Sequence, residues 1–242
     1  MNNHFSVLVA NGSHVGFAPI ICDEMAASAK ARGTGIAKRT PEYIRMKILE
    51  GKAVIAFNEE GVWAGFCYIE TWSHGGYVAN SGLIVAPAFR KSGLAKAIKK
   101  KIFELSRNKY PEAKIFGLTT GLAVMKINSE LGYEPVTYSE LTQDDAFWQG
   151  CQSCVNYDIL MSKERKNCLC TAMLFNPQDQ QQVVESTKDK KDKFDLYGRF
   201  MRIKQWKMLK PFMKGQAKKT TIPVLVIILF AIIITVIEKW KK

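Results

Sequence analysis

Residues 78–95 read Val-Ala-Asn-Ser-Gly-Leu-Ile-Val-Ala-Pro-Ala-Phe-Arg-Lys-Ser-Gly-Leu-Ala, and this stretch decides the fold. Its apolar run at 83–85 has the character of the end of a buried strand. Pro87 stops that strand, because proline has no N–H to give to a strand ladder. After a basic turn that contains a glycine, apolar residues recur at helical spacing from Leu94 to Leu105. The pattern predicts a strand, a tight turn and the start of a helix.

This arrangement is suited to binding an anion. The N–H groups of a helix's first turn have no acceptor within the helix, and the helix dipole adds partial positive charge there. Gly93 lets the backbone approach a phosphate closely, and Arg90 and Lys91 add charge. The alternative is an ordinary strand-to-helix connection with solvated lysines.

The motif Arg90-x-x-Gly93-x-Ala95, preceded by Val85-x-Pro87, resembles the acyl-CoA pyrophosphate loop of the GNAT N-acetyltransferase superfamily. The resemblance implies acetyl-CoA or another acyl-CoA as the cofactor. It places the pantetheine arm along the backbone of one strand end and the pyrophosphate at the turn. The implied cofactor-binding residues are Leu83, Ile84, Val85, Arg90, Lys91, Ser92, Gly93, Leu94 and Ala95.

The order of predicted elements supports the same fold. Apolar periodicity and the turn residues predict a strand, two helices, three strands, a helix, a strand, a helix and a strand. This order predicts an α/β (α+β) domain over residues 1–175, with a mixed, mostly antiparallel sheet flanked by helices. It matches the GNAT order from residue 5 to about residue 174.

Within the superfamily, several short motifs resemble the acetyltransferase domain of N-acetylglutamate synthase. They are Leu118-Thr119-Thr120, Leu131-Gly132-Tyr133-Glu134-Pro135-Val136, Arg165-Lys166-Asn167 and the basic segment 35–40. The resemblance implies N-acylation of glutamate or a related amino acid, as in arginine biosynthesis. Two alternatives remain: a protein or polyamine N-acetyltransferase, and an acyl-CoA-binding sensor module without turnover.

The catalytic groups depart from the family pattern. Many GNAT enzymes carry a glutamate eight residues before the strand's proline, and here that position is Ala79, followed by Asn80. Glu70 and His74 are nearby candidates for the base, although each can also be an ordinary strand or loop residue. The family's common tyrosine donor falls on Asn128. The absence of the family's usual residue at both positions is compatible with a family whose active sites vary, or it indicates an altered activity.

A glutamate-like acceptor carries two carboxylates, which arginine recognises through two parallel hydrogen bonds. By resemblance the substrate-binding candidates are Lys38, Arg39, Arg165 and Asn167. Each of the charged candidates can equally be a solvated surface charge.

Four cysteines, Cys151, Cys154, Cys168 and Cys170, cluster in the sequence. Two pairs at this separation are compatible with a four-cysteine zinc site. Buried or reactive thiols and disulfides are the alternatives.

The net charge of +13 is concentrated in the C-terminal part. Residues 1–185 hold 20 Lys/Arg against 18 Asp/Glu, and residues 186–242 hold 15 against 4. The folded domain is therefore nearly neutral, and a nucleic-acid partner is not expected. The start of the chain does not resemble a secretory signal, so we expect a reducing, cytoplasmic setting.

The C-terminal part divides into three predicted segments: a polar linker at 176–193, a basic amphipathic segment at 194–219 and a candidate transmembrane helix at 220–240. The uncharged run at 222–237 is about 24 Å long as a helix at 1.5 Å per residue, and flanking lysines and Trp240 can extend it. We expect this helix to anchor a cytoplasmic domain to the membrane. A dimerisation helix is the alternative, and the oligomeric state is not indicated.

Overall fold

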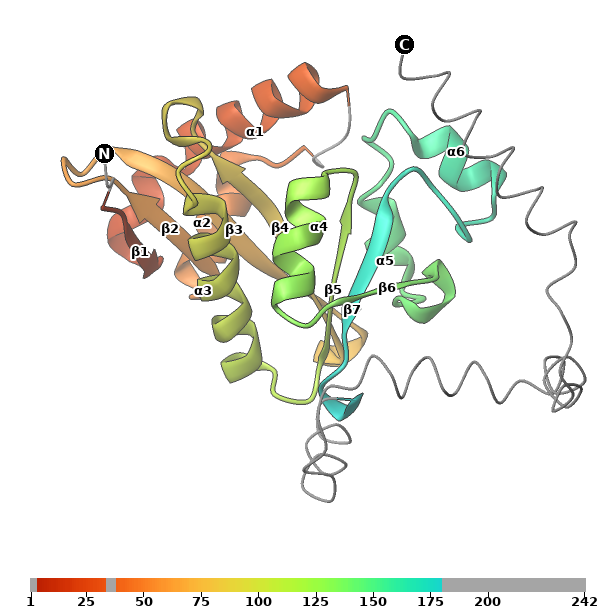
Figure 1. The fold of residues 1–242 in the computed structure, drawn as a ribbon. Helices are drawn as coiled ribbons and strands as arrows, with labels where there is room; N and C mark the ends of the chain where they lie inside the picture. Colours follow the sequence, from red (N-terminus) through yellow and green to blue (C-terminus); the bar gives the residue numbers. More distant parts are fainter. Residues whose placement is uncertain (1–3, 34–37, 180–242) are drawn as a thin grey trace, which may run out of the picture. The chain divides into compact units, whose positions relative to one another are not determined.

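A seven-stranded sheet forms the centre of the structure (Figure 1). The structure is a computed structural model that describes residues 4–33 and 38–179. The strands are β1 (Ser6–Val9), β2 (Ala53–Phe57), β3 (Trp63–Trp72), β4 (Tyr77–Val85), β5 (Lys114–Thr119), β6 (Glu134–Val136) and β7 (Thr171–Phe175). The α-helices are α1 (Ala18–Arg32), α2 (Pro41–Leu49), α3 (Leu94–Lys109), α4 (Leu122–Glu130), α5 (Asp145–Gln149) and α6 (Tyr157–Ser162).

The strands follow the order β1-β2-β3-β4-β5-β7-β6 across the sheet. Every neighbouring pair is antiparallel except β4 and β5, which run parallel. The prediction of a mixed, mostly antiparallel sheet is confirmed. The short helices α5 and α6 were not predicted.

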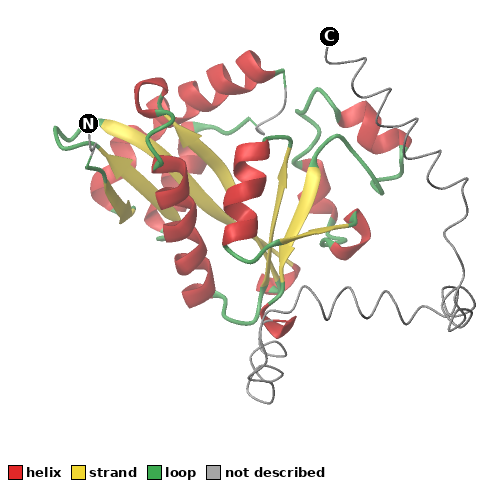
Figure 2. Cartoon of the chain, in the orientation of Figure 1, coloured by secondary structure: helices red, strands yellow, loops and turns green. Residues whose placement is uncertain are grey.

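Helices cover both faces of the sheet (Figure 2). On one face, Ile21 and Met25 of α1 and Ile44 and Ile48 of α2 pack in a core with β2 and β3. On the other face, the apolar stripe of α3 packs on Val54, Cys67 and Val78 of three adjacent strands. The sheet is therefore buried on both sides, and its central strands consist almost entirely of buried residues.

The residues at the start of α2 determine where this helix begins. Thr40 has an extended backbone and its hydroxyl accepts a hydrogen bond from the Tyr43 N–H at 3.2 Å. Pro41 follows at the first helical position, where its missing N–H costs nothing. The predicted start at Thr40-Pro41 is confirmed, and it places residues 38–40 beside the end of β3.

The three predicted C-terminal segments lie beyond residue 179, or reach beyond it, and so fall outside the described residues almost entirely. In the ranges 4–33 and 38–179, none of the helices has the length and apolar character needed to cross a bilayer. The linker, the basic segment and the membrane helix therefore stay predictions.

Candidate active site

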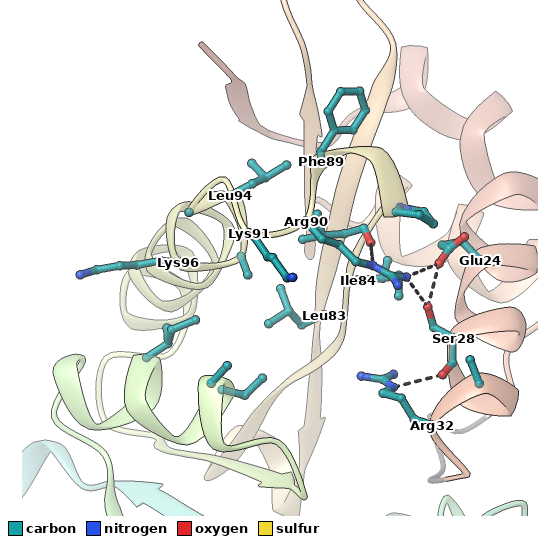
Figure 3. Close-up of a pocket in the computed structure, with 18 of the residues that line it drawn as sticks. Glu24, Ser28, Arg32, Leu83, Ile84, Phe89, Arg90, Lys91, Leu94 and Lys96 are labelled. Atoms are coloured by element: carbon teal, nitrogen blue, oxygen red, sulfur yellow. Dashed lines mark hydrogen bonds and ion pairs between the residues drawn. The ribbon is translucent and has the colours of Figure 1, made fainter. Parts of the chain in front are cut away.

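A groove of about 630 Å³ lies between α1, the end of β4 and the first turn of α3 (Figure 3). We call it the α3 groove. Eight of the nine predicted cofactor residues line it, namely Leu83, Ile84, Val85, Arg90, Lys91, Gly93, Leu94 and Ala95. The ninth, Ser92, donates its hydroxyl to the carbonyl of Phe89 at 2.7 Å.

The turn before α3 has the backbone that an anion site requires. Gly93 is the N-cap of α3 with a φ of 84°, and no side chain caps the helix at this residue. A Cβ built on Gly93 would meet no atom within 4 Å, so the space beside the helix N-terminus is open. Lys91 is also left-handed, with a φ of 64°, and its side chain reaches down between α3 and β4 (Figure 3). The first-turn N–H groups of α3 therefore face space that a phosphate can enter.

Arg90 was predicted to add positive charge to the anion site, but in the structure its guanidinium is bonded to neighbouring residues. Its guanidinium Nη2 lies 2.8 Å from Oε1 of Glu24 and 2.8 Å from the hydroxyl of Ser28, both on α1. Its Nε donates to the carbonyl of Val85 at 3.1 Å. Arg90 thus ties α1 to the end of β4, and much of its charge is already paired within the wall of the groove (Figure 3).

Beyond this groove, β4 and β5 separate. They pair only over residues 77–79 and 114–116, although β4 continues to Val85 and β5 to Thr119. A cavity of about 230 Å³, which we call the junction cavity, opens where they separate. It is bordered by residues 79–83 of β4 and 116–119 of β5. Strand backbone that has no strand partner here can hydrogen-bond to an extended ligand.

A bulge in β4 shapes this opening. Phe66 and Tyr68 of β3 pair with Ile84 and Ser81, so β4 contains one extra residue in this interval. Gly82 lies within it at a φ of 63°, and a Cβ there would lie 2.3 Å from Cε1 of Tyr68. Only glycine satisfies both the left-handed backbone and the close approach.

A third cavity of about 570 Å³ lies against the ends of β3 and α5, and we call it the acceptor pocket after the predicted acceptor ligands Lys38 and Arg39 in its lining. Its lining includes Lys38, Arg39, Tyr43, Glu70, Trp72, Ser81, Leu118, Phe147, Cys151, Cys154 and Cys170. The three cavities adjoin one another: Leu83 borders both the α3 groove and the junction cavity, and Ser81 and Leu118 border both the junction cavity and the acceptor pocket. Together they form a series from the N-terminus of α3 to Glu70.

Glu70 lies directly opposite Ala79 in the β3–β4 ladder. Directly opposed residues of antiparallel strands project to the same face with Cβ atoms about 5 Å apart. In the family that the motif at 85–95 resembles, many members carry a glutamate at the position that corresponds to Ala79. The carboxylate is therefore present at nearly the same place on the sheet, but it comes from the neighbouring strand.

The surroundings of Glu70 are cationic and nearly closed to water. Oε2 lies 2.9 Å from Nζ of Lys47, and Oε1 lies 3.8 Å from Nη2 of Arg39. The Tyr43 hydroxyl donates to Oε1. Burial raises the pKa of Glu70 to about 7, against the lowering effect of the Arg39 charge. A carboxyl with a pKa near neutrality can exchange a proton at physiological pH.

The other predicted catalytic residues are not brought to this pocket. His74 is exposed in a turn after β3, with a φ of 55°. Asn80 borders the junction cavity, but its amide donates to the Ser106 hydroxyl at 2.7 Å and accepts from Tyr133 at 3.0 Å, on the α3 side of the sheet. Asn128 is buried against Met173, with its Nδ2 at 3.7 Å from the sulfur. The side chains of Asn80 and Asn128 therefore make their contacts within the core and not with the acceptor pocket.

The predicted acceptor ligands divide into two groups. Lys38 and Arg39 line the acceptor pocket. Arg165 pairs with Asp145 at the start of α5, and the exposed Asn167 borders none of the three cavities. The structure thus brings Lys38 and Arg39, but not Arg165 and Asn167, to Glu70.

The four cysteines line a fourth, small cavity of about 30 Å³, bordered also by Tyr138 and Trp148. Both members of the Cys168/Cys170 pair reach it, just before β7 begins. All four are free thiols. Burial raises the pKa of Cys151 to about 11 and that of Cys170 to about 12, so these two thiols stay protonated near neutral pH.

No group of three or more His, Cys, Asp or Glu side chains within 4–33 and 38–179 is arranged to hold a metal ion. The zinc alternative is therefore not supported, and the reading as buried thiols fits the structure.

The sequence analysis did not identify three residues of the site, Tyr43, Lys47 and Phe147. For Lys47 a signal existed: it falls three residues after Ile44 and next to Ile48, so it lies within the apolar stripe of α2. A lysine on the buried face of a helix needs a partner charge. Phe147 lies on α5, which was not predicted.

No protein-family model matches the sequence, and no curated protein sequence matches it either. Among solved structures, the chain is similar to N-acetylglutamate synthase from Neisseria gonorrhoeae complexed with coenzyme A and N-acetyl-glutamate. The TM-score is 0.52 at 16% identity, over 73% of this chain and 36% of that chain. It is also similar to Rv2747 from Mycobacterium tuberculosis in complex with CoA and the ligand NLQ, with a TM-score of 0.51 at 17% identity, over 71% of this chain and 98% of that chain.

These likenesses show the fold. The chain has the fold of the GNAT acetyltransferases, as the motif at 85–95 predicted. It spans 36% of the N-acetylglutamate synthase chain and nearly all of Rv2747.

Proposed function

We propose that this protein is an acyl-CoA-dependent N-acyltransferase that acylates the amino group of glutamate or a related acidic amino acid. One observation carries the proposal: three adjoining cavities connect an open helix N-terminus at Gly93 with a buried carboxylate at Glu70. A direct acyl transfer needs the thioester and the amine to meet between two such sites. Structural neighbours complexed with coenzyme A and N-acetyl-glutamate, or with CoA, support it.

The acyl-CoA would occupy the α3 groove and the junction cavity. The first-turn amides after Gly93 and the ammonium of Lys91 suit the pyrophosphate. The backbone of residues 83–85 lies beyond the β4–β5 pairing and suits the amides of the pantetheine arm. The second lysine at this wall, Lys96, is 2.7 Å from Glu130 of α4, so it is already paired.

The chemistry requires a neutral amine. Glu70 accepts a proton from the acceptor's ammonium group, and the amine nitrogen then attacks the thioester carbonyl carbon. The C–N bond forms, the C–S bond breaks, and CoA leaves as a thiolate. The nitrogen gives up a second proton as the amide forms, and this balances the proton that the thiolate takes up. A pKa of about 7 leaves a substantial share of Glu70 ionised at neutral pH, ready to act as the base.

The charge of the acceptor pocket supports an acidic acceptor. Lys38 and Arg39 line it, and the charge of Glu70 is matched by Lys47 behind it. The Arg39 guanidinium is held by the Tyr68 hydroxyl, which accepts from Nε at 2.9 Å, and it lies 5.0 Å from the ring centre of Tyr43. A held guanidinium loses little entropy on binding a carboxylate. A polyamine or a basic peptide would be repelled by this pocket.

The test is an assay of the full-length protein with acetyl-CoA or succinyl-CoA and a panel of amino acids, polyamines and peptides, following the release of free thiol. We expect turnover with acidic amino acids and an N-acyl product by mass spectrometry. Glu70→Gln should lower kcat/KM by about 10²- to 10⁴-fold, as for loss of a general base. The matched control is Glu134→Gln, an exposed carboxylate on β6. Turnover restricted to polyamines or peptides would refute the acidic acceptor.

A second candidate is a sensor that binds acyl-CoA without turnover. Ala79 and Asn128 favour it, because neither of the family's usual acid–base positions carries its usual residue, and Asn128 is turned into the core. Tight acyl-CoA binding by calorimetry, with no thiol released for any acceptor and no effect of Glu70→Gln, would favour the sensor over the enzyme.

A further inference from the structure

Lys47 is a buried cation on the core side of the acceptor pocket. It lies in the apolar stripe of α2 between Ile44 and Ile48 and is only 7% exposed. It does not line the acceptor pocket, whereas Arg39, Tyr43 and Glu70 do. Burying a lysine costs free energy unless a partner compensates for the lost water.

The compensating partner is Glu70, and the contact is specific to one oxygen. The ammonium of Lys47 lies 2.9 Å from Oε2, while Tyr43 and Arg39 approach Oε1. An ionised carboxylate oxygen accepts about two hydrogen bonds. Oε1 therefore keeps capacity for a further donor after it accepts from Tyr43, and its neighbours Tyr43 and Arg39 are residues of the pocket wall.

Two other charges lie near Lys47. Glu50 and Lys52, after the end of α2, form their own ion pair at 2.8 Å. Of the charges packed around the Glu70 carboxylate, Arg39 lies at 3.8 Å, so Lys47 supplies the closest positive charge.

We propose that Lys47 is a positioning residue, which keeps Glu70 ionised and holds its Oε2 so that Oε1 serves the acceptor. The catalytic consequence rests on the proposed function, but the ion pair can be tested without it. Removing the ammonium would leave the carboxylate buried with only Arg39 and the Tyr43 hydroxyl opposing protonation. Glu70 would then hold its proton to higher pH.

The first measurement is the pH profile of kcat/KM for the full-length protein, its Lys47→Met and Lys47→Arg variants, and Lys52→Met as the matched control. Activity is lost as the pH falls through the pKa of Glu70. In Lys47→Met this acidic limb should move upward by about one pH unit or more. Lys47→Arg, which keeps the charge, and Lys52→Met should stay close to the parent. An unchanged limb in folded Lys47→Met would overturn the proposal, and Lys47→Gln carries the same expectation if the Met variant does not fold.

The second measurement needs no catalytic activity. Urea unfolding of the parent, Lys47→Met, Glu70→Gln and the double variant gives the coupling free energy of the pair. We expect a favourable coupling at pH 8, where Glu70 is ionised, and a smaller one at pH 5.5, where it is protonated. Zero coupling at pH 8 would overturn the role of Lys47. Coupling in a protein that turns over no acceptor would support the ion pair and count against the proposed function instead.

Discussion

The bulge at Gly82 gives a prediction with a magnitude. Alanine at this position must adopt a φ of 63°, and its Cβ would lie 2.3 Å from Cε1 of Tyr68 and 2.8 Å from Cε of Met25. The left-handed backbone costs about 1–2 kcal/mol for a residue with a Cβ. Tyr68 is 2% exposed and its hydroxyl is held by Arg39, so relieving the clash adds about 1–3 kcal/mol, as in overpacked cores.

Gly82→Ala should therefore lower the free energy of unfolding by about 2–5 kcal/mol, measured by urea titration at pH 7. The control is Gly61→Ala in the β2–β3 turn, where φ is 76° but nothing lies within 4 Å of the added Cβ. That variant carries the backbone strain alone, so the difference between the two isolates the clash. Equal losses in both variants would refute the argument that Tyr68 and Gly82 fit closely.

Three further predictions concern the groove, the acceptor pocket and the core. Gly93→Trp should abolish acyl-CoA binding, measured by calorimetry. Gly93→Ala has the same backbone strain at a φ of 84° but not the bulk of tryptophan, and it should bind acyl-CoA far better. Comparable affinities of the two variants would show that this turn does not bind acyl-CoA. Arg39→Ala should raise the acceptor KM about 10- to 100-fold through loss of one charge-assisted contact, with the acyl-CoA KM nearly unchanged. Arg165→Ala, which removes a charge paired with Asp145 instead, should change neither KM; equal effects of the two variants would contradict the placement. Burial lowers the pKa of Lys99, so the unfolded state binds more protons than the folded state, and the free energy of unfolding should rise with pH up to the ordinary lysine range. Lys99→Met should be more stable than the parent at pH 7, and the difference in free energy of unfolding should close toward pH 10. A difference that does not change with pH in urea titrations would refute this.

The cofactor side of the site was predictable because it is continuous in the sequence. Residues 83–95 carry the strand end, the proline, the glycine turn and the helix start in order, and each signal is local. The acceptor pocket is assembled from six separate parts of the chain: residues 38–43, 70–72 and 146–154, and the single residues Ser81, Leu118 and Cys170. Periodicity places each segment on an element but does not say which elements meet.

Two failures have specific physical causes. Arg165 was expected to face the acceptor, but Glu164 and Arg165 have left-handed backbones, with φ of 51° and 61°, and Arg165 meets Asp145 instead. A left-handed turn at two non-glycine residues has no recognisable sequence signal. The helix α5 was not predicted, although the sequence contains a signal for its start. Asp144 is a good N-cap residue, and its Oδ1 accepts a hydrogen bond from the Ala146 N–H at 2.9 Å.

The two departures from the family pattern do not carry equal weight for catalysis. A thiol has a pKa of about 8.5, so a CoA thiolate leaves readily near neutral pH without a proton donor beside it. The ammonium group of an amino acid is mostly protonated at neutral pH and must lose its proton before nitrogen can attack. The loss of a donor at Asn128 therefore costs less than the loss of a base would. Under the proposed function, the base is the group that matters more, and Glu70, opposite Ala79 on the adjacent strand, is the carboxylate proposed for it. The geometry thus favours an enzyme over a sensor, and the pH profile of the Lys47 variants examines that same carboxylate.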